Sequence, residues 1–96
     1  MQVQATGIPW YREQDYERLV ALFNDGSKLP ATFSQWQAKA QGLHDHLTSK
    51  GSVVVKAYID PDTFPEWCRT HGHEMDAQAR MAFGNECAYK AITGKP

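Results

Sequence analysis

Sulfur and imidazole side chains gather in the second half of the chain, where Cys68, His71 and His73 stand close together and Cys87 follows. Thiolates and imidazoles are the usual ligands of tetrahedral zinc. If the two helices that carry the cysteines fold back on each other about residues 72–75, Cys87 lies on the order of 12 Å beyond the level of Cys68. The two thiols could then share neither a metal nor a disulfide, which needs Cα atoms within about 7 Å.

A weaker metal site remains conceivable at His71, His73 and Glu74, which form one local cluster. Imidazole and carboxylate groups can bind zinc and related ions. His71 also stands near a predicted helix end, where it would interact favourably with the helix dipole without any metal. We therefore predict no bound metal and no cofactor. The cluster is kept as an alternative function, a small-ligand or metal-binding module.

Motifs for nucleophilic catalysis and for phosphate binding are not found in the sequence. The serines stand in predicted turns or at helix boundaries without a nucleophile elbow, and neither cysteine stands in a recognised catalytic context. Asp60 and Asp62 follow the predicted strand where a glycine-rich phosphate loop would stand, and their charge would repel phosphate. Turn formation explains both carboxylates better than cation binding does. We expect no enzyme activity.

Two adjacent aromatic residues, Trp10 and Tyr11, precede the first predicted helix and are followed by Arg12. They are either a hydrophobic staple that fixes the entry into the helix or exposed anchors of a binding surface. Burial is favoured for residues of this size. If they are exposed, they form a hypothetical interaction surface with Arg12, Lys56 and Tyr58.

The elements that position these residues begin with one clear strand at residues 53–59. Its side chains alternate as in a half-buried strand, with Lys56 and Tyr58 on the more polar face. A strand must pair its backbone groups. Two partners are equally favoured: residues 2–6, or a second copy of the strand, paired antiparallel across a two-fold axis.

Four helices are predicted around this strand. Apolar spacing of three and four predicts the first at residues 13–23. A Thr-x-x-Gln capping box at Thr32 begins the second, which ends before Gly51 and buries a stripe of apolar residues, Phe33, Trp36, Ala40, Leu43 and Leu47. Pro65 in a first helical turn marks the third helix, and Asp76 caps the fourth, which ends near residue 92.

Polar residues on these helices are expected to face solvent. His44 and His46 stand two apart on the second helix, point about 200° apart, and cannot chelate one ion. Three arginines could recognise an acidic partner but are expected to be solvated helix charges instead: Arg18, Arg69 and Arg80. The fourth helix is rich in alanine and glycine, and small residues allow close packing against other elements or another subunit.

Length and charge place the chain in the class of small α+β domains. Its 96 residues make one domain, 1–96, in which residues 1–6 and 93–96 lack apolar anchors and are expected to be flexible or weakly ordered. A net charge of −1 without charged blocks argues against a nucleic-acid footprint. No apolar run approaches the roughly 18 residues of a membrane span, and no signal-peptide pattern is present, so we expect a cytoplasmic protein.

These observations favour a non-catalytic protein-interaction or regulatory module of about four helices and a minimal two-stranded or dimer-completed sheet. A homodimer that forms through strand 53–59 is the expected assembly. The alternatives are the metal or small-ligand module described above and a nucleic-acid adaptor. No motif in the sequence identifies a family.

Overall fold

A computed structural model of the chain describes residues 5–93. The order of elements is β1 (Ala5–Trp10), the 3-10 turn η1 (Glu13–Asp15), α1 (Tyr16–Leu22), the 3-10 turn η2 (Gly26–Lys28), α2 (Phe33–Ser49), β2 (Val53–Tyr58), α3 (Phe64–Thr70) and α4 (Ala77–Thr93). These four helices and two strands form a small α+β domain and confirm the predicted fold class.

The two strands run parallel, in a register that extends from Ala5 opposite Val53 to Trp10 opposite Tyr58. The predicted strand therefore has a partner within the chain, at residues 5–10 rather than 2–6. The prediction was wrong about this segment because Gly7 and Pro9 are poor strand formers and hide its extended character. Of the residues expected to be weakly ordered, Ala5 and Thr6 belong to β1 and Thr93 ends α4, while 1–4 and 94–96 lie outside the described residues.

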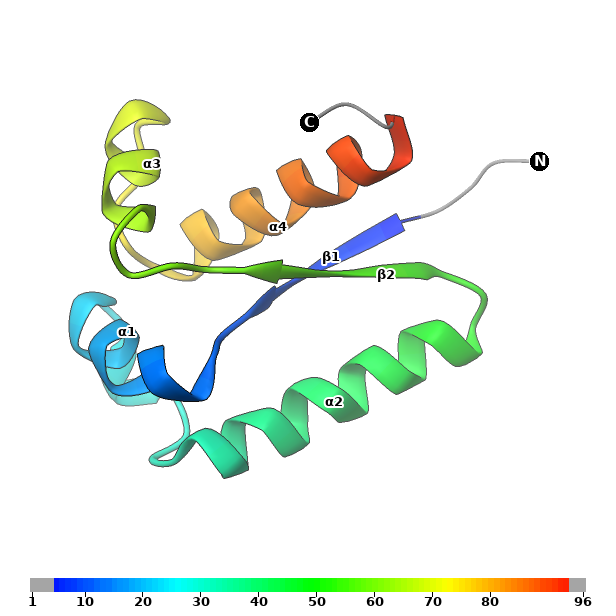
Figure 1. The fold of residues 1–96 in the computed structure, drawn as a ribbon, viewed down its shortest axis with the longest axis horizontal. Helices are drawn as coiled ribbons and strands as arrows, with labels where there is room; N and C mark the ends of the chain where they lie inside the picture. The colour runs from blue at the N-terminus through cyan, green and yellow to red at the C-terminus, as the bar shows by residue number, and fades with distance from the viewer. Residues whose placement is uncertain (1–4, 94–96) are drawn as a thin grey trace.

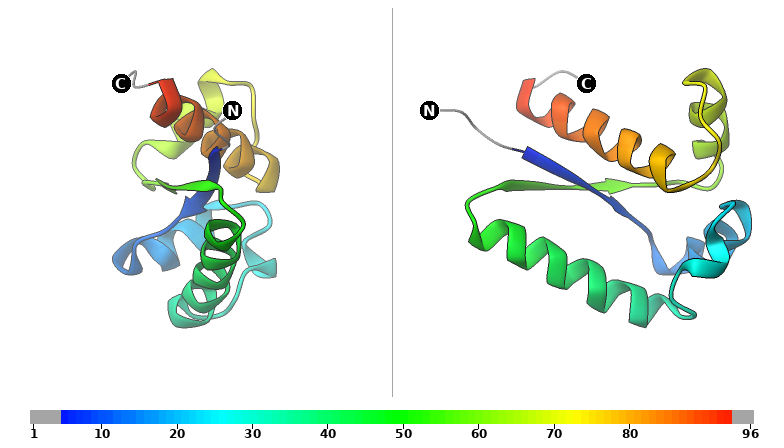
Figure 2. Two further views of the ribbon diagram at one scale, coloured as in Figure 1. Left: turned by 90° about the vertical axis from the view of Figure 1, so that its right-hand side faces the viewer. Right: turned by 180° about the vertical axis from the view of Figure 1, so that it is seen from behind.

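The sheet lies between two long helices. In Figure 1, α2 covers one face and α4 the other, while α1 and α3 lie at the end where both strands finish. Figure 2 shows the same three layers from the side and from behind. A parallel pair needs a long crossover connection, and here α1 and α2 together supply it.

Local sequence signals explain where most helices begin. The Thr32 hydroxyl accepts a hydrogen bond from the backbone N–H of Gln35 at 3.2 Å, as the capping box predicts. Pro65 lies in the first turn of α3, and the Asp76 carboxylate accepts from the N–H of Ala79 at 3.0 Å ahead of α4. The first predicted helix is divided into η1 and α1 and ends at Leu22, one residue before its predicted end.

The buried face of α2 differs from the predicted stripe. Trp36 and Ala40 are buried, but Leu43 is 49% exposed. His44 instead turns towards the sheet, and its ring centroid lies 6.3 Å from that of Trp10. The prediction failed here because a spacing of three or four residues fits either position, and the location of Trp10 decides between them.

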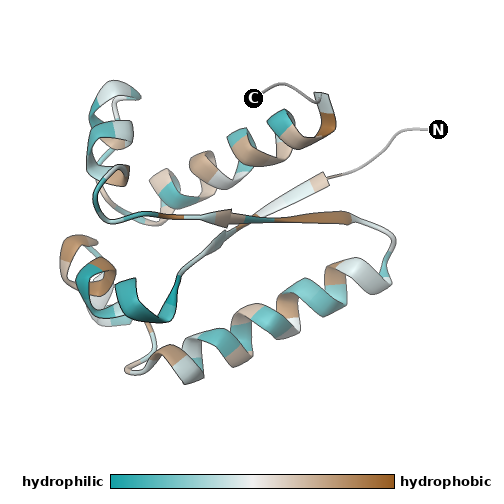
Figure 3. Ribbon diagram, viewed as in Figure 1, coloured by the Kyte–Doolittle hydropathy of each residue, from teal (hydrophilic) through white to brown (hydrophobic). Residues whose placement is uncertain are grey.

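Aromatic side chains fill the core in two groups. Around Trp36 the rings of Trp10, Tyr11, Tyr16 and Phe33 lie with centroids within 6.1 Å of its own. The second group lies under α3 and α4 and consists of Phe23, Phe64, Trp67 and Phe83. The first half of β2, which lies between α2 and α4, is hydrophobic and is coloured brown in Figure 3.

Candidate interaction surface

The outer edge of β2 carries backbone groups without a strand partner, and we call its outward residues Val54, Lys56 and Tyr58 the β2 edge. The N–H of Ile59 donates to the carbonyl of Trp10 at 2.9 Å. In a parallel ladder the N–H and C=O of one residue point to the same side, and successive residues alternate. The three residues of the β2 edge therefore point away from β1, and the sheet formed by residues 5–93 has no third strand.

The outer edge of β1 is much less able to pair. Trp10 directs its backbone to β2, so Pro9 and Gly7 direct theirs outward. Pro9 has no N–H to donate. A Cβ atom built on Gly7 would lie 1.8 Å from the carbonyl oxygen of Gly84, so α4 packs directly on the face of this strand. Proline on an edge strand is a common protection against pairing, and the β2 edge is left as the open side of the sheet.

Cationic side chains lie over aromatic rings beside the β2 edge. The Lys56 ammonium lies 4.4 Å from the centroid of the Trp10 ring, and the Arg12 guanidinium lies 4.6 Å from that of Tyr58. Tyr58 remains 44% exposed, and Val53, at the start of the strand on the opposite face, is 49% exposed. The strand thus presents unpaired backbone together with exposed apolar area, a combination that favours association with another strand.

The predicted surface is only partly assembled. Trp10 and Tyr11 are each 3% exposed and pack against Trp36, so they belong to the core, which is the alternative that the sequence favoured, and they are not exposed anchors. Their burial follows from the extent of β1, which runs through Trp10 and turns its indole towards α2. Arg12 and the two outward residues Lys56 and Tyr58 remain on the surface.

A buried ion pair joins α4 to the loop after α1. Both Nη atoms of Arg80 donate to the carboxylate oxygens of Asp25 at 2.8 Å, and its Cζ atom lies 4.5 Å from the centroid of the Phe23 ring. Arg80 is 7% exposed, so the predicted solvated charge is wrong. Arg80 lies four residues before Gly84, on the face of α4 that contacts the sheet, but the sequence alone does not indicate that this face is buried.

Hydrogen bonding and burial shift the pKa values of Asp25 and Tyr11 in opposite directions. The hydrogen bonds from Arg80 hold the pKa of Asp25 below its usual range. Burial raises the pKa of Tyr11 to about 12, although the nearby positive charge of Arg80 opposes the shift. Asp25 is therefore an anion and Tyr11 a neutral phenol at physiological pH, which fits a structural role for both.

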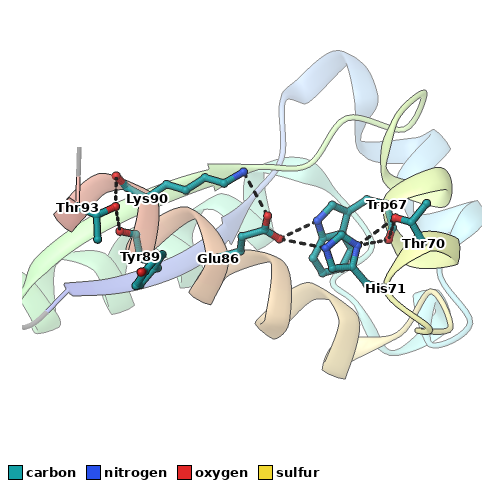
Figure 4. Close-up of polar contacts among 7 residues, drawn as sticks. All are labelled: Trp67, Thr70, His71, Glu86, Tyr89, Lys90 and Thr93. Atoms are coloured by element: carbon teal, nitrogen blue, oxygen red, sulfur yellow. Dashed lines mark hydrogen bonds and ion pairs between the residues drawn. The ribbon is translucent and has the colours of Figure 1, made fainter. Parts of the chain in front are cut away.

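A second polar cluster joins α3 to α4 on the surface (Figure 4). The Glu86 carboxylate accepts from Trp67 Nε1 at 2.8 Å and lies 3.2 Å from Lys90 Nζ and 3.6 Å from His71 Nε2. Partial burial acts to raise the pKa of Glu86, but the hydrogen bonds from Lys90 and Trp67 outweigh it and lower that pKa. The cluster fixes the position of α3 against α4.

The predicted metal ligands do not converge on one point. Nδ1 of His71 lies 2.8 Å from the Trp67 carbonyl, and the ring of His73 lies parallel to Trp67 with centroids 5.8 Å apart. Glu74 accepts a hydrogen bond from the Asn24 amide at 2.9 Å. Within residues 5–93 no group of three or more histidine, cysteine, aspartate or glutamate side chains is arranged to hold a metal ion.

Both cysteines are free thiols in the structure. Burial raises the pKa of Cys68 and of Cys87, which keeps each in the protonated, unreactive form near neutral pH. Asp60 accepts from the N–H of Asp62 at 2.8 Å, and Asp62 lies 2.7 Å from Arg18. The Asp60 carboxylate therefore forms the predicted turn, whereas the Asp62 carboxylate forms a surface ion pair that was not predicted.

Comparisons with known proteins found no matching family model, no matching curated protein and no matching solved structure. Across residues 5–93, no helix has both the length and the apolar character needed to span a bilayer.

Proposed function

We propose that this protein is a non-catalytic protein-interaction module that forms a homodimer through its β2 edge. The two edges would pair antiparallel across a two-fold axis and join two small sheets into one of four strands. The observation that carries the proposal is the open β2 edge, with three residues whose backbone groups point outward, whereas Pro9 removes a hydrogen-bond donor from the outer edge of β1.

A second copy of the chain fits this edge for two reasons. A two-fold axis places identical strands antiparallel, so one edge satisfies the other without any further sequence requirement. Parallel sheets are also typically larger than two strands and covered on both faces, and the helices α2 and α4 already cover both faces of each half. The dimer would extend these layers and cover Val53, which is 49% exposed in the monomer.

The contact area sets the expected affinity. Stable interfaces bury about 1,200–2,000 Å² in total, and pairing of two six-residue strands with few flanking side chains is a smaller contact. We therefore expect a reversible dimer with a dissociation constant of about 1–100 µM. Such an assembly is consistent with a regulatory module whose state depends on its concentration.

The alternative functions have less support. The metal module requires His71, His73 and Glu74 to converge, and each has a different partner. A nucleic-acid adaptor requires free basic side chains on one face. The three arginines considered for recognition each pair with a carboxylate, namely Arg18 with Asp62, Arg69 with Glu66 and Arg80 with Asp25. The cytoplasm remains the proposed location, and two free thiols fit a reducing compartment.

The proposal is tested by Lys56→Pro, with Lys56→Thr as its control. The N–H of Lys56 points away from β1, so proline removes a donor from the β2 edge without removing one from the β1–β2 ladder. Threonine removes the same charge and keeps the N–H. Sedimentation velocity should show a concentration-dependent dimer for the wild type and Lys56→Thr, and at least about tenfold weaker association for Lys56→Pro.

Two results would overturn the proposal. The first is a wild-type protein that remains monomeric at a concentration about tenfold above the expected dissociation constant. The second is a Lys56→Pro variant that keeps its native circular dichroism spectrum and dimerises as strongly as Lys56→Thr. In the second case the dimer would use another surface.

A further inference from the structure

We infer that the two-fold axis of this dimer passes through Lys56, so that Lys56 pairs with the partner's Lys56 and Val54 with the partner's Tyr58. This inference rests on the proposed function and adds the register of the interface. Two observations support this register: the backbone groups of Val54, Lys56 and Tyr58 point outward, and the Lys56 side chain lies over Trp10.

Three symmetric registers engage at least two of the outward residues on each strand. Hydrogen-bonded pairs in an antiparallel ladder form between residues whose N–H and C=O both face the partner, and on this edge these are Val54, Lys56 and Tyr58. The axis can then pass through residue 55, 56 or 57. An axis at Lys56 engages all three residues on each strand and makes about six hydrogen bonds, whereas the other two registers engage two and make about four.

The alternative registers also make poorer side-chain pairs. An axis at Val55 places Val54 opposite the partner's Lys56. An axis at Ala57 places Val54 opposite the partner's Asp60, whose carboxylate already accepts from Asp62 in the turn after β2. An axis at Lys56 instead pairs a β-branched residue with an aromatic one, Val54 with the partner's Tyr58, and such pairs stabilise antiparallel sheets.

Repulsion between the two lysines is the obvious objection to this register. Like charges directly opposite each other destabilise a sheet, but by no more than about one hydrogen bond contributes. The geometry reduces even this effect. Each Lys56 ammonium lies 4.4 Å from the Trp10 ring centroid, and Trp10 belongs to β1, on the side of β2 away from the β2 edge. The two ammonium groups therefore point away from each other.

Single cysteine substitutions distinguish the three registers. Only a residue on the axis meets its own copy, at a Cα separation of about 4.5–5.5 Å, which is within the range of a disulfide. We expect Lys56→Cys to form a covalent dimer under mild oxidation at least about tenfold faster than Val55→Cys or Ala57→Cys, because neither of these meets its own copy in this register. The unsubstituted chain, with Cys68 and Cys87 alone, is the control and should not cross-link.

A mixing experiment gives a second readout that keeps Lys56. An equal mixture of Val54→Cys and Tyr58→Cys should give mainly mixed covalent dimers, because these positions face each other only in the inferred register. Faster cross-linking of Val55→Cys or Ala57→Cys would overturn the register and leave the dimer standing. A sedimenting dimer without any cross-link would overturn pairing through the β2 edge, and a monomer with no cross-link would overturn the proposed function itself.

Discussion

Gly7 of β1 and Gly84 of α4 pack backbone against backbone. A Cβ atom on Gly7 would lie 1.8 Å from the Gly84 carbonyl oxygen, and one on Gly84 would lie 2.7 Å from the Gly7 carbonyl oxygen. No side chain fits between β1 and α4 at this point of contact. The close approach fixes α4 against β1 on one face of the sheet.

Gly7→Ala should therefore destabilise the domain strongly. The added methyl group has to displace backbone rather than a flexible side chain, and overpacking of this kind costs about 1–3 kcal/mol or more. Gly42→Ala is the matched control. Gly42 lies within α2 with nothing within 4 Å of its Cβ position, so alanine should stabilise by about 0.5–1 kcal/mol. Urea unfolding of both variants gives the comparison, and equal effects would contradict the close packing.

Asp25→Ala should be more destabilising than Arg80→Met. The aspartate substitution leaves a guanidinium that is 7% exposed without its partner, and breaking a buried pair costs about 3–5 kcal/mol. Asp25 is partly exposed, so we expect about 2–3 kcal/mol here. Methionine at position 80 removes both the charge and the need for a partner while keeping apolar contact with Phe23. The free energies of unfolding of the two variants test this order. A larger loss for Arg80→Met would contradict the role of Asp25 as the partner of a buried charge.

Acid should weaken the wild-type domain more than Asp25→Asn. Arg80 lowers the pKa of Asp25 in the folded state relative to about 3.9 in the unfolded chain. The stability from this carboxylate is therefore complete above the unfolded value and is lost as pH falls through the folded value. Thermal melts from neutral pH down to about pH 2 should show the two proteins converging below about pH 4. A constant difference across this range would contradict the assignment.

Alkali should weaken the wild type through Tyr11. Burial raises its pKa to about 12 in the folded state, against about 10 in the unfolded chain. The folded state then holds the proton more strongly, so stability is complete below pH 10 and falls by about 2 kcal/mol as pH rises towards 12. Tyr11→Phe has no phenol to ionise, so this loss of stability should be absent from the variant. Denaturant unfolding at pH 9 and pH 11 should show a smaller loss for the phenylalanine variant, and equal losses would contradict the burial of the phenol.

Most elements of the fold could be predicted from local signals. The alternation of residues 53–59 predicts β2, and Thr32, Pro65 and Asp76 mark helix starts that the structure contains. β1 could not be recognised because Gly7 and Pro9 have low strand propensity. They are present for reasons that only the assembled fold shows: Gly7 admits α4, and Pro9 closes the outer edge.

The candidate surface was predicted only in part. Lys56 and Tyr58 follow from the alternation of β2, but Trp10 and Tyr11 are core residues because β1 extends to Trp10. The burial of Arg80 depends on Asp25, 55 positions away in sequence, and no local pattern indicates such a pair. Local sequence thus predicts which residues share a strand or helix face, and the pairing of distant elements decides which face is buried.

Pairing through the β2 edge can be measured by residue-resolved amide hydrogen exchange of the wild type across a dilution series. We expect the N–H groups of Val54, Lys56 and Tyr58 to be protected at high concentration and to lose protection on dilution. The N–H groups of Val55 and Ala57, which point to β1, should stay protected at all concentrations. Fast exchange of the three β2 edge amides at every concentration would contradict dimerisation through this edge.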